Sequence, residues 1–330
     1  MKIVLENGGM VMSDTGMWLA LRKLRRQLSF WRVVAVLAIV TALALVVWRG
    51  GAPGAGGAHL ARIRIDGFIT GRQKMLDLIA GLARNKRVKA VIVRIDSPGG
   101  TTAGSEAIYR ALMRLAKKKP VVTVMDGVAA SGGYMVALAG ERMFASRNTI
   151  TGSIGVIVQW PELHELMGRI GVRMQTVRSG PLKALPNTFE PTPEAARRVL
   201  EDLVRDSYDW FVELVAKRRK LDKETARKLA DGRIYSGRRA LKAGLIDALG
   251  DEVEARHWLE RKHAIPFDTK VVEYRPRSSL LKELGVPGAL AAALRLFGLD
   301  AATGRLLEGR SGLDGLLSVW HPEITALGAN

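Results

Sequence analysis

Short apolar runs alternate with segments of helical spacing along residues 59–177. Runs such as AVIVRI are typical of buried strands, whereas apolar residues three and four positions apart are typical of helices. Strands are predicted at residues 59–66, 90–95, 121–125, 143–145, 154–158 and 172–177, and helices at 72–84, near 105–117 and after the small-residue stretch 126–133. Strands that alternate with helices and are joined by Gly-rich turns predict a layered α/β fold with a largely parallel sheet and flanking helices.

A long helix is predicted after the Pro-rich segment 181–191. Thr192 is expected to cap this helix and Pro193 to occupy its first position. One of its faces carries a wide apolar stripe, which we expect to pack on the core or on another subunit. The stripe consists of Val199, Leu200, Leu203, Val204, Trp210, Phe211, Leu214 and Val215. A further helix and a closing turn are expected within residues 232–251.

Residues 30–48 form an apolar segment with a single charge, Arg32, near its start. At about 1.5 Å per residue, a helix of this length covers roughly 28 Å, close to the hydrocarbon thickness of a bilayer. The basic run LRKLRR lies upstream, so the positive-inside rule places residues 1–29 in the cytoplasm and everything after Trp48 outside. We therefore expect one transmembrane anchor, followed by a Gly/Pro/Ala linker at 49–58. A cleaved signal peptide is the alternative.

The chain is strongly basic, with a formal net charge of +19. Such an excess suits nucleic acid or an anionic membrane surface. No nucleic-acid recognition motif accompanies it, so we expect the lipid bilayer as a partner and no nucleic acid. The chain has no cysteine, which excludes disulfides, thiolate catalysis and thiolate metal sites.

Ser131 lies in the run AASGG at the predicted start of a helix. A flexible loop is one interpretation, and a nucleophile open to a substrate carbonyl is the other. None of the five histidines follows a metal-ligand spacing or sits in a triad setting, so another base would have to take the serine proton. A neutral lysine can do this. Lys183, in the segment RSGPLKALP, is one candidate, and a solvated loop lysine is the alternative interpretation of it.

Two further segments, DSPGG and TGSIG, are rich in small residues and could contribute to an active site. In DSPGG, Gly99 and Gly100 follow a predicted strand and would let backbone N–H groups point into a cleft, as an oxyanion hole requires. A plain Pro-Gly turn is the alternative. In TGSIG, Ser153 lies between two glycines at the start of a predicted strand.

Taken together, these segments resemble the bacterial signal peptide peptidase A family, the Ser-Lys peptidases of family S49 with the ClpP/crotonase fold. The resemblance rests on DSPGG, DGVAASGGY, ITGSIGV, SGPLKAL and DGRIYSGRRALKAGLIDALG in this order. It implies that Ser131 is the nucleophile, that Lys183 is the general base, and that Ser153 orients the lysine amine. Backbone N–H groups of Gly99, Gly100 and Gly132 would form the oxyanion hole.

The resemblance also implies an architecture and partners. Residues 59–265 would be the peptidase domain and 266–330 an extension of unknown role. One copy of each motif matches the short form of the family, whose members assemble into dome-shaped rings in which the lysine of one subunit completes the serine of the next. It further implies a single-pass protein of the bacterial inner membrane with a periplasmic catalytic domain. No cofactor or metal is required.

The function implied is endopeptidase cleavage of signal peptides and other extended, membrane-associated peptides through an acyl-enzyme. Two other functions stay open from the sequence. One is a non-catalytic membrane scaffold or regulator on the same fold. The other is a crotonase-type enzyme acting on acyl-CoA, although the predicted anchor argues against it.

Overall fold

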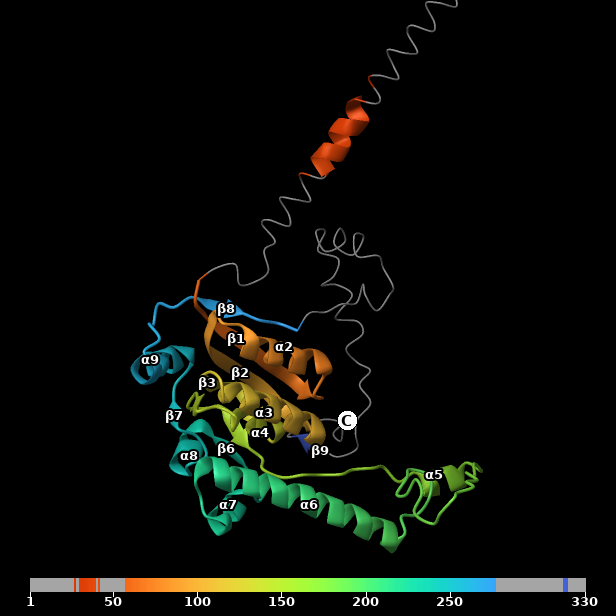
Figure 1. Cartoon of the computed structure of the whole chain (residues 1–330). Helices are drawn as coiled ribbons and strands as arrows, with labels where there is room; N and C mark the ends of the chain where they lie inside the picture. Colours follow the sequence, from red (N-terminus) through yellow and green to blue (C-terminus); the bar gives the residue numbers. More distant parts are fainter. Residues whose placement is uncertain (1–26, 28–29, 40, 42–56, 277–316, 320–330) are drawn as a thin grey trace, which may run out of the picture. The chain divides into compact units, whose positions relative to one another are not determined.

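A nine-stranded sheet organises the part of the chain that the computed structural model describes, which comprises residues 27, 30–39, 41, 57–276 and 317–319 (Figure 1). The strands are β1 (His59–Ile69), β2 (Val88–Thr101), β3 (Val121–Ala130), β4 (Arg142–Ala145), β5 (Ile150–Gly152), β6 (Ile234–Ser236), β7 (Ala248–Leu249), β8 (Val271–Glu273) and β9 (Leu317–Val319). The main path runs β6-β5-β3-β2-β1-β8. Only the β5–β6 and β2–β9 pairs are antiparallel among these strands. The predicted α/β fold with a largely parallel sheet is confirmed.

Both faces of the sheet are covered, which is why its strands read as nearly continuous apolar runs. The helices are α2 (Gln73–Arg84), α3 (Thr102–Ala116), α4 (Gly132–Ala137), α5 (His164–Arg169), α6 (Glu194–Arg219), α7 (Lys223–Leu229), α8 (Gly237–Lys242) and α9 (Glu252–His263). Alternate strand residues such as Ile63 and Val93 form one core with α2, α3, α4 and α6. The intervening residues, such as Ile92 and Val122, pack instead with Leu259 of α9 on the opposite face.

The long predicted helix is α6, and only half of its apolar stripe is buried. Phe211 and Val215 lie in the core, whereas Val199 and Leu203 are exposed. The predicted start is wrong by one residue, because α6 begins at Glu194 with Pro193 as its N-cap. The Thr192 hydroxyl donates instead to Glu162, over 2.6 Å.

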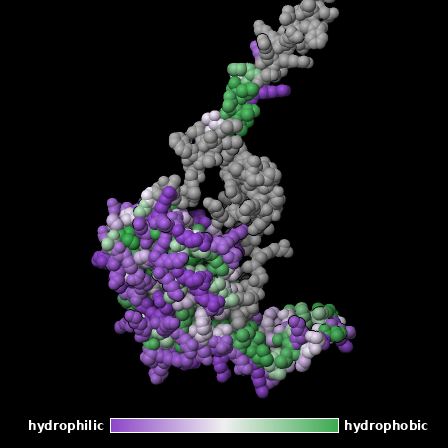
Figure 2. Space-filling model, viewed as in Figure 1, coloured by the Kyte–Doolittle hydropathy of each residue, from purple (hydrophilic) through white to green (hydrophobic). Residues whose placement is uncertain are grey.

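Two predicted strands are absent from the described structure. Residues 154–158 and 172–177 were expected to be strands, but the nearest strand is β5, which ends at Gly152. After Ser153 the chain leaves the sheet and forms a projecting segment, residues 157–192, which we call the arm; it carries α5 (Figure 1). Apolar residues that suggested a strand there, such as Met174 and Val177, are exposed on the arm (Figure 2). An apolar run without strand partners on either side cannot form a ladder.

The residues after 95, which were expected to form a loop, instead continue the strand. Strand β2 continues through DSPGG as far as Thr101, and α3 begins at Thr102. The Thr101 hydroxyl accepts a hydrogen bond from the Gly104 amide, 3.1 Å away, and so caps the helix.

The chain divides into two units, residues 1–55 and 56–330. Residues 30–39 are helical, but no helix in the described residues is long and apolar enough to span a bilayer. Most of the predicted cytoplasmic segment 1–29, part of the predicted anchor 30–48 and most of the linker 49–58 lie outside the described residues. The extension 266–330 is described only as far as residue 276 and at 317–319. The anchor therefore stays a prediction.

Candidate active site

Ser131 is held in a strained conformation where β3 meets α4. Its φ of 55° and ψ of −116° lie outside the regions that side-chain-bearing residues favour, and such a conformation costs on the order of 1–3 kcal/mol. Its amide donates to the carbonyl oxygen of Gly152 over 2.7 Å, and its carbonyl accepts from the Met135 amide over 2.9 Å. The surrounding fold fixes the backbone on both sides of the serine, so its position does not depend on loop flexibility.

The small residues around Ser131 are explained by close backbone approach. A Cβ on Gly133 would lie 2.7 Å from the carbonyl oxygen of Ser97 in β2. Helix α4 therefore packs directly on the DSPGG segment. Tyr134, fully buried in the same helix, donates its hydroxyl to the Leu245 carbonyl over 2.8 Å, and burial raises the pKa of Tyr134. The helix that begins beside Ser131 is thus fixed from both sides.

The DSPGG segment is ordered by its own serine. The Ser97 hydroxyl donates to the carbonyl of Gly67 over 2.6 Å and accepts from the amide of Gly99 over 3.1 Å. A Cβ on Gly100 would lie 2.0 Å from the carbonyl oxygen of Ile69, so only glycine fits against β1. Because the Gly99 amide is already engaged, the oxyanion candidates that remain are the amides of Gly100 and Gly132. Ser97 was not predicted to take part in the site, although it lies inside the motif.

Ser153 directly follows β5 and lines the same pocket as Ser131. Its φ is 48°, and its amide donates to the Arg233 carbonyl over 2.8 Å. Strand β5 is attached to β3 by the Thr151 hydroxyl, which donates to the Ala129 carbonyl over 2.7 Å. The two serines predicted from separate motifs are therefore brought together by the β3–β5 pairing.

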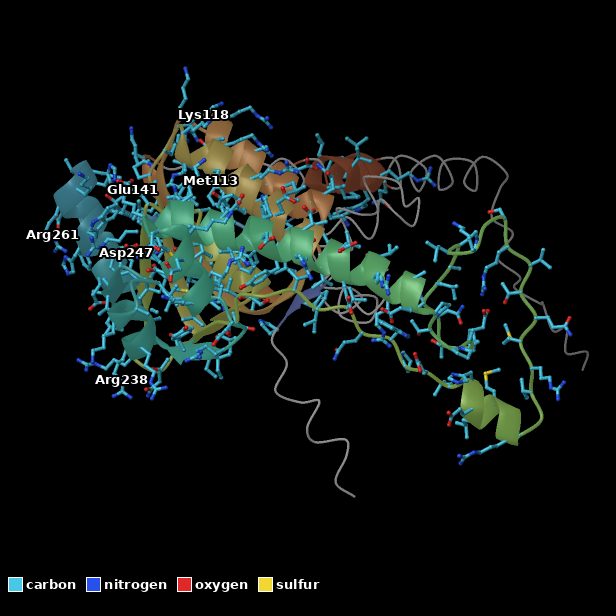
Figure 3. All side chains as sticks on the ribbon, turned by 90° about the horizontal axis from the view of Figure 1, so that it is seen from below. Met113, Lys118, Glu141, Arg238, Asp247 and Arg261 are labelled. Carbon is cyan, nitrogen blue, oxygen red and sulfur yellow. The ribbon has the colours of Figure 1, made fainter. Side chains whose placement is uncertain are left out.

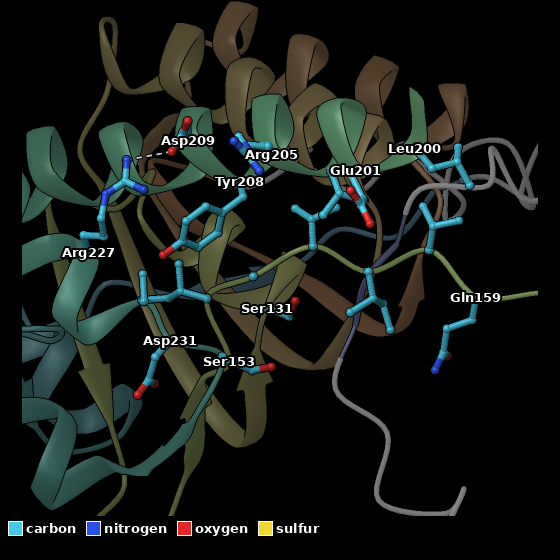
Figure 4. Close-up of a pocket in the computed structure, with 18 of the residues that line it drawn as sticks. Ser131, Ser153, Gln159, Leu200, Glu201, Arg205, Tyr208, Asp209, Arg227 and Asp231 are labelled. Carbon is cyan, nitrogen blue, oxygen red and sulfur yellow. Dashed lines mark hydrogen bonds and ion pairs between the residues drawn. The ribbon is translucent and has the colours of Figure 1, made fainter. Parts of the chain in front are cut away.

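Ser131 and Ser153 line one pocket of about 1040 Å³ (Figure 4). The stretch 153–160 forms one side of this pocket, and residues of α6 such as Leu200 and Tyr208 form the other. Three arginines and three acidic residues also line it, so the pocket carries no excess charge: Arg197, Arg205, Arg227, Glu201, Asp209 and Asp231. An open, mixed apolar and polar groove of this size suits an extended polypeptide.

Paired charges line part of the pocket. Arg227 donates to Asp209 over 2.6 Å, and its guanidinium lies 5.7 Å from the centre of the Tyr208 ring. Burial raises the pKa of Tyr208. Asp231 is paired with Arg233, whose hydrogen bond lowers the pKa of that carboxyl. These residues were not predicted, because nothing in the spacing of α6 indicates which of its faces lies toward Ser131.

Lys183 is not brought to Ser131 within one chain. It lies exposed on the arm, where its amide donates to the Gly180 carbonyl over 3.1 Å. Neither a lysine nor a histidine occurs among the described residues that line the pocket. The two serines are therefore in place, while the predicted base is not.

Strand β9, from the region beyond residue 266, pairs with the end of β2 beside Ser131. Gly99, Gly100 and Thr101 face residues 319, 318 and 317 in antiparallel register. The backbone of this part of β2 thus accepts an added strand, which is a common way to bind extended peptides. No sequence pattern predicted this pairing.

Comparisons with known proteins identify the relatives of this chain. The family model described as peptidase family S49 matches residues 113–265. The chain is 39% identical over 200 residues to a candidate protease of Synechocystis, a match that covers 60% of this chain and 72% of that protein. It is 34% identical over 204 residues to a candidate signal peptide peptidase SppA of Enterococcus faecium, covering 62% of this chain and 59% of the relative. Over 203 residues it is 36% identical to Protease 4 of Haemophilus influenzae, covering 60% of this chain and 33% of the relative.

Proposed function

Because this chain belongs to peptidase family S49 and is a serine peptidase, we propose that it is a Ser-Lys endopeptidase whose active site is completed between two subunits. Ser131 is the nucleophile, and Lys183 from a second copy is the general base. The observation that carries this proposal is the pocket that holds Ser131 and Ser153 but neither a lysine nor a histidine among its described lining residues. Serine is a weak nucleophile until a base accepts its proton, so a base must come from elsewhere.

The arm supports a second subunit as the source. It projects from the sheet and exposes apolar side chains that one chain leaves uncovered, namely Leu163, Leu166, Ile170, Val172, Met174, Val177, Leu182 and Phe189. Exposed apolar side chains in such number on one segment favour burial against a protein surface. The first half of the α6 stripe, with Val199 and Leu203, is likewise exposed. A ring of copies would bury both surfaces and bring each Lys183 to a neighbouring Ser131.

The reaction proceeds in two halves. Neutral Lys183 accepts the Ser131 proton as Oγ attacks the peptide carbonyl carbon, and the amides of Gly100 and Gly132 stabilise the oxyanion. The lysine then gives this proton to the leaving amine as the C–N bond breaks, which leaves an ester on Ser131. Water, deprotonated by Lys183, hydrolyses the ester and restores the serine hydroxyl. The Ser153 hydroxyl accepts a hydrogen bond from the lysine amine and orients it.

The substrate class follows from how the site binds backbone. The end of β2 accepts an antiparallel strand, as β9 demonstrates within the chain, so an extended peptide can bind by the same hydrogen bonds. Cleaved signal peptides are apolar and can be extended, and a relative carries the name signal peptide peptidase. A membrane anchor at residues 30–48 would hold the periplasmic catalytic domain close to such substrates.

A complementation experiment tests the shared site. Ser131→Ala and Lys183→Ala should each abolish hydrolysis of a fluorogenic signal-peptide analogue. Subunits of the two variants, dissociated and reassembled together, should regain about a quarter of wild-type activity, because half of the serines are intact and half of their neighbours supply the lysine. Arg173→Ala, which removes an exposed basic residue from the same arm, is the matched control and should keep full activity.

Two outcomes would contradict the proposal. Activity in the Lys183→Ala variant alone would show that another group is the base. Inactive mixtures of variants that assemble normally would show that Ser131 and Lys183 act within one subunit.

A further inference from the structure

The edge of the sheet where the parallel strands begin is basic. Parallel strands start at a common edge, and here the connections that enter β2 and β3, together with the end of α9, carry cations. Lys86 and Lys89 flank the start of β2, Lys117 and Lys118 precede β3, and Arg261 and Lys262 end α9. All six side chains are exposed. We call this set the basic edge.

Contacts across the edge place α9 beside β3 and β4. His263, next to Lys262, lies 2.9 Å from the Glu141 carboxylate, and the Glu141 amide donates to the Val121 carbonyl over 2.7 Å. Figure 3 shows Lys118, Glu141 and Arg261 at the end of the molecule away from the arm. The basic edge is therefore one continuous surface, although its residues come from three separate segments.

The cations of the basic edge are not neutralised by the protein. None of the six forms an ion pair with another residue in the described part of the chain. Glu141, one of the acids at this edge, is already paired with His263. Burial lowers the pKa of neighbouring Lys119, and the positive charge of Lys89 lowers it further. Like charges are thus close enough to repel one another.

Helix dipoles explain only part of this arrangement. A cation at the end of a helix is favourable, which accounts for Lys117, Arg261 and Lys262. It accounts also for Lys86, which follows the C-cap of α2, but not for Lys89, which lies within β2. A surface that concentrates unpaired cations from helices and a strand alike favours a polyanionic partner.

The position at which the chain enters the domain indicates which kind of polyanion binds this edge. Strand β1 begins at this same edge with His59, only ten residues (49–58) after the predicted membrane segment. Ten residues span at most about 35 Å, so a chain anchored through residues 30–48 cannot carry this edge far from the headgroups. We propose that the basic edge docks on anionic phospholipid headgroups at the membrane surface. This inference rests on the proposed anchor and not on the Ser-Lys pair.

Lysine footprinting on the full chain tests the docking. The Ser131→Ala chain, used so that catalysis plays no part, is reconstituted in nanodiscs of phosphatidylcholine with or without phosphatidylglycerol. Acetylation by a water-soluble reagent is then read at each lysine by mass spectrometry. Lys86, Lys89, Lys117, Lys118 and Lys262 should react about fivefold more slowly when the anionic lipid is present, because basic residues near such a surface are attracted by about that factor.

Lysines elsewhere on the domain are the internal controls. Lys74, in the first turn of α2, and Lys228, in α7, should react equally in both lipids. The triple variant Lys86→Gln, Lys118→Gln, Lys262→Gln should lose the protection of Lys89 and Lys117. Neutralising exposed side chains leaves folding intact, and a matched triple variant at Lys74, Lys223 and Lys228 should retain the protection.

Equal labelling of the basic edge in both lipids would overturn the proposal. Equal protection by duplex DNA at the same phosphate concentration would also overturn it, since the edge would then be a general polyanion surface. Neither result bears on the peptidase proposal, because the complementation experiment above measures that separately.

Discussion

The amide of Ser131 donates a hydrogen bond of 2.7 Å to the carbonyl of Gly152. This bond joins the residue at the end of β3 to the residue immediately before Ser153. Together with the β3–β5 pairing, this contact couples the positions of the two serines. Any change that moves β5 changes the site, even though β5 contributes no catalytic group of its own.

Gly152→Ala should lower both activity and stability. Gly152 has a φ of 80°, and an added Cβ would lie 2.5 Å from the Tyr235 ring. The chain must shift there, so we expect kcat/KM to fall at least tenfold, or about 1.4 kcal/mol in transition-state stabilisation. Gly81→Ala, in α2 with no atom within 4 Å of the new Cβ, is the control and should leave the rate unchanged. Wild-type kcat/KM in Gly152→Ala would show that the coupling is not needed.

Ser153→Ala should lower kcat and leave KM nearly unchanged. In the proposed mechanism its hydroxyl orients the lysine amine without touching the peptide, and loss of a correctly placed base typically costs about 10²-fold or more. Steady-state kinetics on the fluorogenic peptide check this, and a serine-directed acylating probe separates acylation from binding. A rise in KM alone would instead make Ser153 a substrate contact.

Removing the strand at residues 317–319 should improve peptide binding. Strand β9 uses the same backbone of Gly99–Thr101 that an extended substrate would use. A deletion of residues 317–319 should therefore lower KM without changing kcat, because it removes a competitor from the groove. Deletion of three residues nearer the C-terminus is the control. An unchanged KM would mean that substrate does not pair with β2.

The arm should become more mobile at acidic pH. A hydrogen bond from Arg178 lowers the pKa of Glu190, and Thr176 and Asn187 lower it further. A carboxyl with a depressed folded-state pKa contributes stability above its ordinary value of about 4.3 and loses it as the pH falls through the folded value. Hydrogen exchange should therefore find the arm more mobile in Glu190→Gln than in wild type at pH 6.5, with the difference vanishing at a pH well below the folded-state pKa of Glu190.

The arm carries its own control for this experiment. Glu165→Gln, on α5, should behave as wild type at both pH values, because Glu165 has no ion pair within the described structure. A difference between Glu190→Gln and wild type that persists at low pH would show that packing, and not the carboxylate, holds the arm.

Tyr134→Phe should destabilise the domain by about 1–2 kcal/mol, because it leaves the buried Leu245 carbonyl without its donor. Urea unfolding followed by circular dichroism measures the change. Tyr208→Phe is the matched control, since the Tyr208 hydroxyl makes no hydrogen bond with the rest of the described chain, and it should stay within about 0.5 kcal/mol. Equal stability of Tyr134→Phe and wild type would show that water replaces the lost donor.

The central sheet could be predicted from the sequence because its strands are buried on both faces. Runs such as Val91–Ile95 can therefore be recognised as strands without knowing which strands pair with them. The error at 154–158 has the opposite cause: that run is as apolar as a strand, yet the strand edge beside it is taken up by β5 and β6. Apolarity indicates burial or contact, but pairing decides which apolar run becomes a strand.

Some features of the candidate site could likewise be predicted from the sequence, and others could not. Ser131 could be predicted because glycine and alanine surround it for a local reason, the close packing of α4 on Ser97. Its relation to Ser153 depends on the β3–β5 pairing, and the proposed relation to Lys183 would depend on a second subunit. Neither is encoded in local spacing, so the motif resemblance and not the periodicity suggested them.

If the basic edge docks on headgroups as proposed, the length of β3 would set the distance between the nucleophile and the lipid. The strand leaves the basic edge at Val121 and ends at Ala130, one residue before the nucleophile. At about 3.3 Å per residue, its ten residues hold Ser131 roughly 30 Å from the headgroups on which the basic edge would rest. A peptide with one end still in the bilayer could reach the nucleophile only through some ten residues of extended chain. Chains cut by this enzyme would then be selected by how far they protrude from the lipid as well as by their side chains.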